Sequence, residues 1–131
     1  MEISVSIEQA KVPVAVMHIQ GDIDASNFLR VIAKAQEIYK NPARHLLVDL
    51  SEVPFISSAG LVAMHRIALL YSGAPQALAQ NPPQDLTHSS DVGRHVKLLN
   101  PQPTVEHILE TTGLKPFFKV FYDLDSALAS F

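Results

Sequence analysis

The chain has no cysteine among its 131 residues, so neither disulfides nor thiolate chemistry are available to it. No stretch approaches the ~18 consecutive apolar residues that span a membrane, and the segment Met1 to Ser4 lacks the basic flank and apolar block of a signal peptide. Lys and Arg number ten against thirteen Asp and Glu, and they are scattered singly. Without a basic patch we expect no binding to nucleic acid, and we expect a cytoplasmic protein.

The motifs of catalysis, of metal binding and of phosphate binding are also missing. The six histidines show no HExxH or comparable ligand spacing, and without cysteine a zinc site is not expected. The pattern G-x-S-x-G of serine hydrolases is absent, and Gly60 has no neighbouring glycine with which to form a phosphate-binding loop. We therefore predict a chain that is not an enzyme and that uses no metal and no cofactor.

The composition predicts one globular domain over residues 1–131, because 47% hydrophobic residues can bury a sizeable core. The run Ile3 to Ile7 alternates with polar residues, which predicts a strand with one wet face. A second apolar run follows at 12–19 with Pro13 near its start, where a proline is tolerated. Together the two runs predict a hairpin.

Helices and strands alternate after this hairpin. Apolar residues at helical spacing predict helices over 25–39 and 58–71, with a strand from Leu46 between them. The pattern then breaks down, and Pro and polar residues predict a long loop insertion over about 74–93. The remaining predicted elements are strands at 94–99 and 117–121, a helix introduced by Pro101 and Pro103 and ended by Gly113, and a last helix capped by Asp123 or Asp125.

This order predicts an α/β fold. Alternating strands and helices imply parallel pairing through right-handed crossovers, with the first strand antiparallel at the margin. The fold class is a single small mixed β-sheet of about five strands with about four helices.

The stretch from Leu46 to Leu61 organises the chain. Its unbroken apolar run, Leu46 to Val48, fits a strand covered on both faces, and Ser57-Ser58-Ala59-Gly60 fits the open end of a helix. The serine hydroxyls therefore stand where a buried strand passes into a helix. In open α/β sheets this edge is where ligands and partners bind.

Three motifs carry a resemblance to a known family: Gly21 to Asp24, Asp49 to Leu61, and Gly113-Leu114. Together they resemble the STAS domain, which includes the anti-sigma factor antagonists and the cytoplasmic domains of sulfate transporters. The resemblance implies a binding protein whose partner is an anti-sigma factor or another kinase-type regulator. In the antagonist branch the partner phosphorylates a serine that aligns with Ser58. Here Ser57 replaces the usual Asp, and Ala59 replaces the second Ser or Thr.

Elementary chemistry gives Ser58 two readings. In the first turn of a helix, unpaired N–H groups and the helix dipole tolerate a phosphate, so a phosphorylated Ser58, or Ser57 as the alternate acceptor, would be a release switch. The other reading is that Ser57 or Ser58 caps the helix and contributes about 1 kcal/mol. Both readings stay open at this point.

The resemblance also implies a partner surface that combines the turn after the second strand with the start of the second helix. If Ile23 and Ile56 are exposed they support docking, and if they are buried they belong to the core. The predicted surface consists of Gly21, Asp22, Ile23, Asp24, Ile56, Ser57, Ser58, Ala59 and Gly60.

Two functions are alternatives to a docking module that phosphorylation switches. The chain could be a sensor for a small ligand, nucleotide or lipid-like, that the 74–93 loop traps against the sheet edge. It could also be a constitutive STAS scaffold subunit with no phosphorylation, which the replacement of Asp by Ser57 favours. In either case the alternating edge strand at Ile3 to Ile7 could pair with a second copy and make a homodimer.

Overall fold

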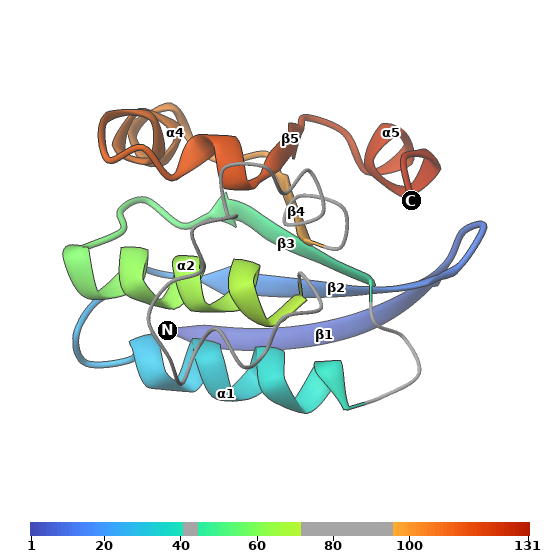
Figure 1. The fold of residues 1–131 in the computed structure, drawn as a ribbon, viewed down its shortest axis with the longest axis horizontal. Helices are drawn as coiled ribbons and strands as arrows, with labels where there is room; N and C mark the ends of the chain where they lie inside the picture. The colour runs from blue at the N-terminus through green and yellow to red at the C-terminus, as the bar shows by residue number, and fades with distance from the viewer. Residues whose placement is uncertain (41–44, 72–95) are drawn as a thin grey trace.

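The computed structural model describes residues 1–40, 45–71 and 96–131. Its centre is a five-stranded sheet in which the strands lie in sequence order (Figure 1). The first two strands pair antiparallel and the rest pair parallel, so the predicted mixed sheet with an antiparallel margin is confirmed. The strands are β1 (Glu2–Gln9), β2 (Pro13–Gln20), β3 (His45–Glu52), β4 (Val96–Leu99) and β5 (Lys119–Phe121).

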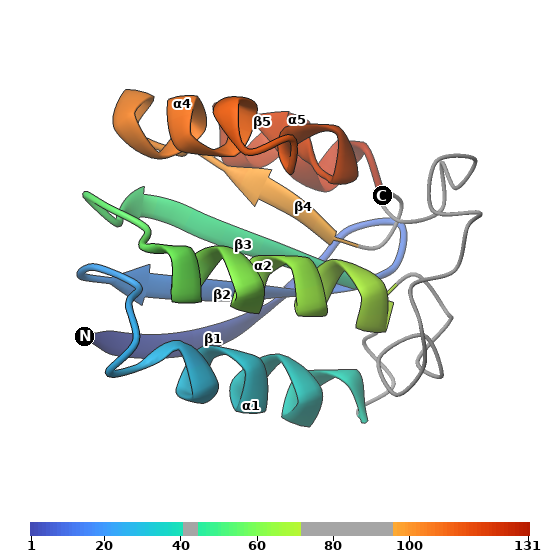
Figure 2. The same cartoon turned by 60° about the vertical axis from the view of Figure 1, so that its left-hand side comes forward.

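Four α-helices cover the two faces of this sheet in the described part of the chain. Helices α1 and α2 run side by side over one face, and α5 lies on the other (Figures 1 and 2). Pro103 opens α4, where its missing N–H costs no hydrogen bond. The helices are α1 (Phe28–Tyr39), α2 (Ser58–Tyr71), α4 (Pro103–Thr111) and α5 (Leu124–Ala129), and a 3₁₀ turn spans Lys115–Phe117.

Strands β2 and β3 have apolar side chains on both faces. Met17 and Val48 point into the larger core cluster with the residues of α1, α2 and α4, while Val16 and Leu47 point into a smaller cluster with Ala127 of α5. Because successive strand residues face opposite ways, a strand buried on both sides is apolar throughout. The run that begins at Leu46 is therefore apolar because the strand is covered on both faces, as predicted.

Helix α1 begins three residues later than its apolar spacing predicts. Asn27 Oδ1 accepts a hydrogen bond from the Asp24 N–H at 2.9 Å, and Asn27 Nδ2 donates to the Asp22 carbonyl oxygen at 2.9 Å. These bonds fold 24–27 into a turn, so the first helical residue is Phe28. Neither Asp24 nor Ser26 occupies the N-cap position, which is held by Asn27.

Two strand predictions also need correction. Strand β5 begins at Lys119, because Lys115–Phe117 forms the 3₁₀ turn. On the apolar face of β1, Ile3 is partly buried against the core, but Val5 is 37% and Ile7 53% exposed, contrary to the prediction. The predicted loop at about 74–93 and the first two residues of the strand predicted at 94–99 lie outside the described residues. Within the described ranges no helix is long and apolar enough to cross a membrane.

Tyr71, the last residue of α2, tests the packing of α2 on α1. It is 1% exposed, its hydroxyl donates to the Ala35 carbonyl oxygen at 2.7 Å, and burial raises its pKa. We expect Tyr71→Phe to lower the free energy of unfolding by about 1 kcal/mol, because a buried hydrogen bond is lost. Tyr122→Phe is the exposed comparison: Tyr122 is 60% exposed and its hydroxyl donates to Glu106 Oε2 at 2.9 Å, a surface bond that water can replace, so this variant should lose less stability than Tyr71→Phe in urea denaturation.

Candidate functional edge of the sheet

The two sequence segments predicted to form the site lie side by side. Ile23 and Ile56 form an isolated parallel bridge beyond the ends of β2 and β3. The Ile23 N–H donates to the Phe55 carbonyl oxygen at 3.1 Å, and the Ser57 N–H donates to the Ile23 carbonyl oxygen at 2.9 Å. The Gly21–Asp24 turn is thus held against the start of α2 by main-chain hydrogen bonds, which are independent of side-chain identity.

The two aspartates of the turn have different environments. Asp24 Oδ1 accepts hydrogen bonds from the N–H and the hydroxyl of Ser26, and these bonds hold the pKa of Asp24 below its usual value. Asp22 is exposed, and among the described residues its main-chain carbonyl accepts a hydrogen bond from Asn27 while its side chain has no partner. Asp24 therefore shapes the turn, while the side chain of Asp22 is available at the surface.

The two serines have separate roles in the structure. Ser57 is the residue before α2, and its Oγ accepts from the Gly60 N–H at 3.4 Å while its carbonyl oxygen accepts from the Leu61 N–H at 2.9 Å. Ser57 thus caps the helix. Ser58 is the first helical residue, it is exposed, and no described residue hydrogen-bonds its hydroxyl. The capping role and the free hydroxyl belong to different residues.

Three of the residues predicted to contact a partner are buried instead. Ile23 is 0% and Ile56 1% exposed, so their side chains belong to the core and cannot form the docking surface. Gly60 is also buried, and a Cβ added to it would lie 2.6 Å from Ile56 Cγ2 and 2.7 Å from the Ile23 carbonyl oxygen. These residues hold the edge together from inside.

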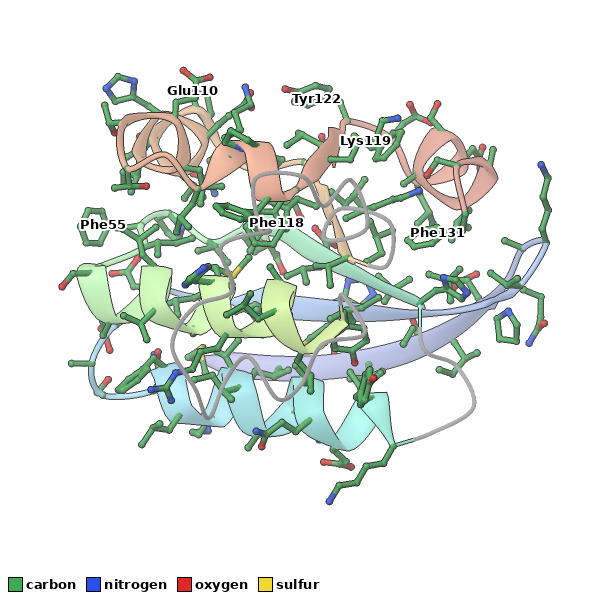
Figure 3. All side chains as sticks on the ribbon, viewed as in Figure 1. Phe55, Glu110, Phe118, Lys119, Tyr122 and Phe131 are labelled. Carbon is green, nitrogen blue, oxygen red and sulfur yellow. The ribbon has the colours of Figure 1, made fainter. Side chains whose placement is uncertain are left out.

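Three exposed apolar residues that the sequence prediction missed surround this edge. Leu29 in the first turn of α1 is 61% exposed, Phe55 before α2 is 47% exposed, and Val62 in the second turn of α2 is 44% exposed. Figure 3 labels Phe55 beside the start of α2. Leu29 and Val62 both fall off the buried stripe of their helices, which was the available signal. For Phe55 the flanking residues gave no such signal.

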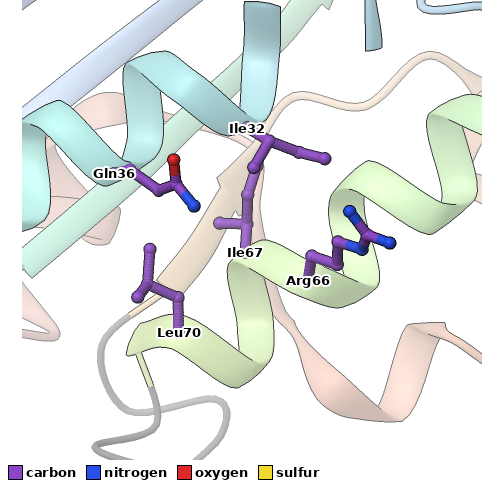
Figure 4. A pocket seen from close by; sticks show the side chains of 5 residues that line it. All are labelled: Ile32, Gln36, Arg66, Ile67 and Leu70. Atoms are coloured by element: carbon purple, nitrogen blue, oxygen red, sulfur yellow. The ribbon is translucent and has the colours of Figure 1, made fainter. Parts of the chain in front are cut away.

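A hollow of about 200 Å³ continues this surface between α1 and α2 (Figure 4). Ser58, Val62 and Arg66 follow one another at four-residue spacing, so they form one ridge along α2. The edge therefore extends from Ser58 toward a cationic side chain two turns away. The hollow is lined by Ile32, Gln36, Arg66, Ile67 and Leu70.

The fold places the chain in a known structural class. An anti-sigma factor antagonist from Mycobacterium paratuberculosis is 22% identical, with 98% of this chain and 93% of that chain covered and a TM-score of 0.67. SpoIIAA, an anti-sigma factor antagonist, matches in its unphosphorylated form at 18% identity, with 95% and 93% of the two chains covered and a TM-score of 0.59. At these identities the likeness establishes the fold.

The phosphorylated form of SpoIIAA from Bacillus also matches. It is 18% identical, with 95% of this chain and 96% of that chain covered and a TM-score of 0.54. No curated protein sequence matches this chain.

The family model of the STAS domain matches residues 6–83, which is more than half of the chain. This protein belongs to the STAS family. The resemblance carried by the Gly21–Asp24 and Asp49–Leu61 motifs is thereby confirmed.

The separation of cap and free hydroxyl can be measured. Ser57→Ala should lower the free energy of unfolding by about 0.5–1 kcal/mol, because the Gly60 N–H loses its acceptor at the start of α2. Ser58→Ala should change it by less than about 0.5 kcal/mol, because that hydroxyl is exposed and unpaired among the described residues. Urea denaturation of both variants decides the assignment, and equal losses would show that Ser58 shares the cap.

Proposed function

We propose that this STAS chain is a protein-binding regulatory module that docks an anti-sigma factor or a kinase-type regulator through its Gly21–Asp24 turn and Ser57–Leu61 helix start. Phosphorylation of Ser58 releases the partner. The supporting observation is the position of Ser58, which is exposed, unpaired among the described residues and next to the turn at the carboxyl edge of the sheet. A module of this kind acts in the cytoplasm, as the sequence predicts.

The position of Ser58 suits a switch that spares the fold. A phosphate in the first turn of α2 meets free N–H groups and the positive end of the helix dipole, so the chain itself tolerates the charge. The same phosphate adds roughly −1.5 to −2 charges in the middle of the docking surface. Each ~1.4 kcal/mol of lost contact energy is a tenfold loss of affinity, so one modification can dissociate a moderate complex.

The surface around Ser58 suits a protein partner. Leu29, Phe55 and Val62 expose apolar area beside the polar turn, which is the mixture found where interfaces have an apolar centre and a polar rim. Phe55 supplies the kind of aromatic side chain that carries much of the energy in such contacts. A partner that covers Ser58 covers these side chains too.

A constitutive scaffold is the second candidate, and Ser57 is the observation that favours it. The antagonists that the sequence resembles carry an aspartate there, whereas Ser57 is neutral and caps the helix through its hydroxyl. A scaffold would bind the same partner through the same edge without modification. The ligand-sensor alternative depends on residues 74–93, which lie outside the described residues.

Affinity capture from a lysate of the native organism separates switch from scaffold. Wild-type and Ser58→Ala baits should both recover an anti-sigma factor or kinase-type protein, and Ser58→Asp should recover at least about tenfold less, because the added charge opposes docking. Ser126→Asp, in the exposed first turn of α5 on the other face of the sheet, is the charge-matched control and should bind like wild type.

Mass spectrometry of the same samples completes the test. A phosphate on the Ser58 peptide of the recovered chain is the expected result. Equal capture by the wild-type and Ser58→Asp baits, with Ser58 never modified, would overturn the switch and leave the scaffold. A Phe55→Ala bait that keeps full capture would place the docking surface elsewhere, since that side chain is 47% exposed beside Ser58.

A further inference from the structure

Among the described residues, strand β1 forms one edge of the sheet. It is eight residues long and pairs only with β2 among the described strands, so its outer N–H and C=O groups face away from the sheet. Edge strands are usually blunted by proline, by charged side chains and above all lysine, by a bulge or by a short length. Between Glu2 and Gln9 there is no proline, no lysine and no bulge, and the charged residues are Glu2 and Glu8 near the two ends of the strand.

One face of β1 exposes apolar side chains. Val5 is 37% and Ile7 53% exposed, and both lie on the side of the sheet that α1 and α2 cover further in, since they pair with Met17 and Ala15 of the larger core cluster. Two neighbouring apolar residues on one face of an edge strand are the pattern that a second strand would cover.

On the other face of the sheet, a chain of polar contacts reaches β1 at Ser6. His18 Nδ1 lies 2.9 Å from Asp49 Oδ2, and His18 Nε2 lies 3.4 Å from Ser6 Oγ. The three side chains come from β3, β2 and β1 in turn, so the chain crosses the sheet and stops at the outermost strand. Ser6 is only half-buried there.

Two-fold symmetry allows several registers for pairing β1 with a second β1, and the exposed apolar residues distinguish them. Centred on Ser4, the strands leave the exposed Ile7 opposite Met1, which lies outside β1. If two antiparallel copies are centred on Ser6, the Val5 of each lies opposite the Ile7 of the other and Ser4 lies opposite Glu8. Centred on Val5, the same strands place Glu2 opposite Glu8 twice, which opposes like charges. If the register shifts by one residue, the apolar face of one strand lies on the same side of the sheet as the polar face of the other.

We propose that β1 is a self-association edge at which two copies of this chain pair antiparallel about a two-fold axis at Ser6, making one continuous ten-stranded sheet from two five-stranded ones. The two Asp49–His18–Ser6 chains then meet at the axis. Val5 and Ile7 are covered on the opposite face. This proposal does not rest on the proposed function, because the two use different surfaces. β1 is an edge strand, whereas Ser58 lies at the ends of the inner strands β2 and β3. A contact of one strand pair is small, so the dimer is concentration-dependent.

Sedimentation equilibrium of the full chain from about 1 µM to about 1 mM tests the association. The mass should rise toward twice 14.4 kDa with concentration. Ile7→Lys should shift the dissociation constant at least about tenfold upward, because a charge then replaces an apolar cross-strand contact. Leu124→Lys, at a residue that is 39% exposed on α5 beside β4 and β5, is the control and should dimerise like wild type. A wild-type chain that stays monomeric throughout overturns the proposal.

The absence of native cysteine allows the register to be tested directly. Ser6→Cys should form an intermolecular disulfide under mild oxidation, because its two copies are directly opposite one another. In the same register two Ser4→Cys residues lie about 13 Å apart, beyond the reach of a disulfide. Cross-linking of Ser4→Cys as fast as Ser6→Cys would contradict the register, and failure of both would contradict the pairing.

Discussion

The close approach of α2 to the end of the sheet depends on the absence of a side chain at Gly60. A Cβ there would lie 2.6 Å from Ile56 Cγ2 and 2.7 Å from the Ile23 carbonyl oxygen, distances that real Cβ contacts do not reach. The same carbonyl oxygen accepts the hydrogen bond from the Ser57 N–H at 2.9 Å. The first turn of α2 therefore sits directly on the Ile23–Ile56 bridge, and the orientation of the serines follows from that contact.

This arrangement divides the edge into an inner frame and an outer surface. Ile23, Ile56 and Gly60 are buried and fix the relative positions of the turn and the helix. Ser57 closes the helix start, and Asp24 and Asn27 shape the turn. What remains exposed on this frame is a small set of side chains, Ser58 and Asp22 with the apolar Leu29, Phe55 and Val62. Substitution of these exposed residues would therefore leave the inner frame of the edge intact.

Most of the architecture could be predicted from local patterns. Burial leaves a pattern of apolar residues that can be read in the sequence. It explains the apolar run from Leu46 to Val48, which is buried on both faces, and the helical spacing after Ser58. The start of α1 could not be predicted this way, because the Asn27 side chain competes with the helix through hydrogen bonds to Asp22 and Asp24.

The two segments predicted to lie together do so, although some of their side chains are buried. The resemblance to the STAS family implied that the Gly21–Asp24 and Ser57–Gly60 segments share one edge, and the main-chain bonds between them confirm this proximity. Ile23 points inward and Phe55 outward, and both lie outside the regular strands, next to the isolated Ile23–Ile56 bridge. The alternation of apolar residues therefore does not predict their directions. The same limit applies at β1, where Val5 and Ile7 alternate correctly and yet remain uncovered.

Native-state amide hydrogen exchange in a Gly60→Ala variant tests the dependence on this close approach most directly. The added methyl should lower the free energy of unfolding by about 1–3 kcal/mol and should selectively speed exchange of the Ser57 N–H, because the helix start is pushed off the Ile23 carbonyl. Gly113→Ala is the comparison, since its φ of 79° strains an alanine while nothing lies within 4 Å of the added atom. Ser57 exchange that is no faster in Gly60→Ala than in Gly113→Ala would contradict the central place given to Gly60.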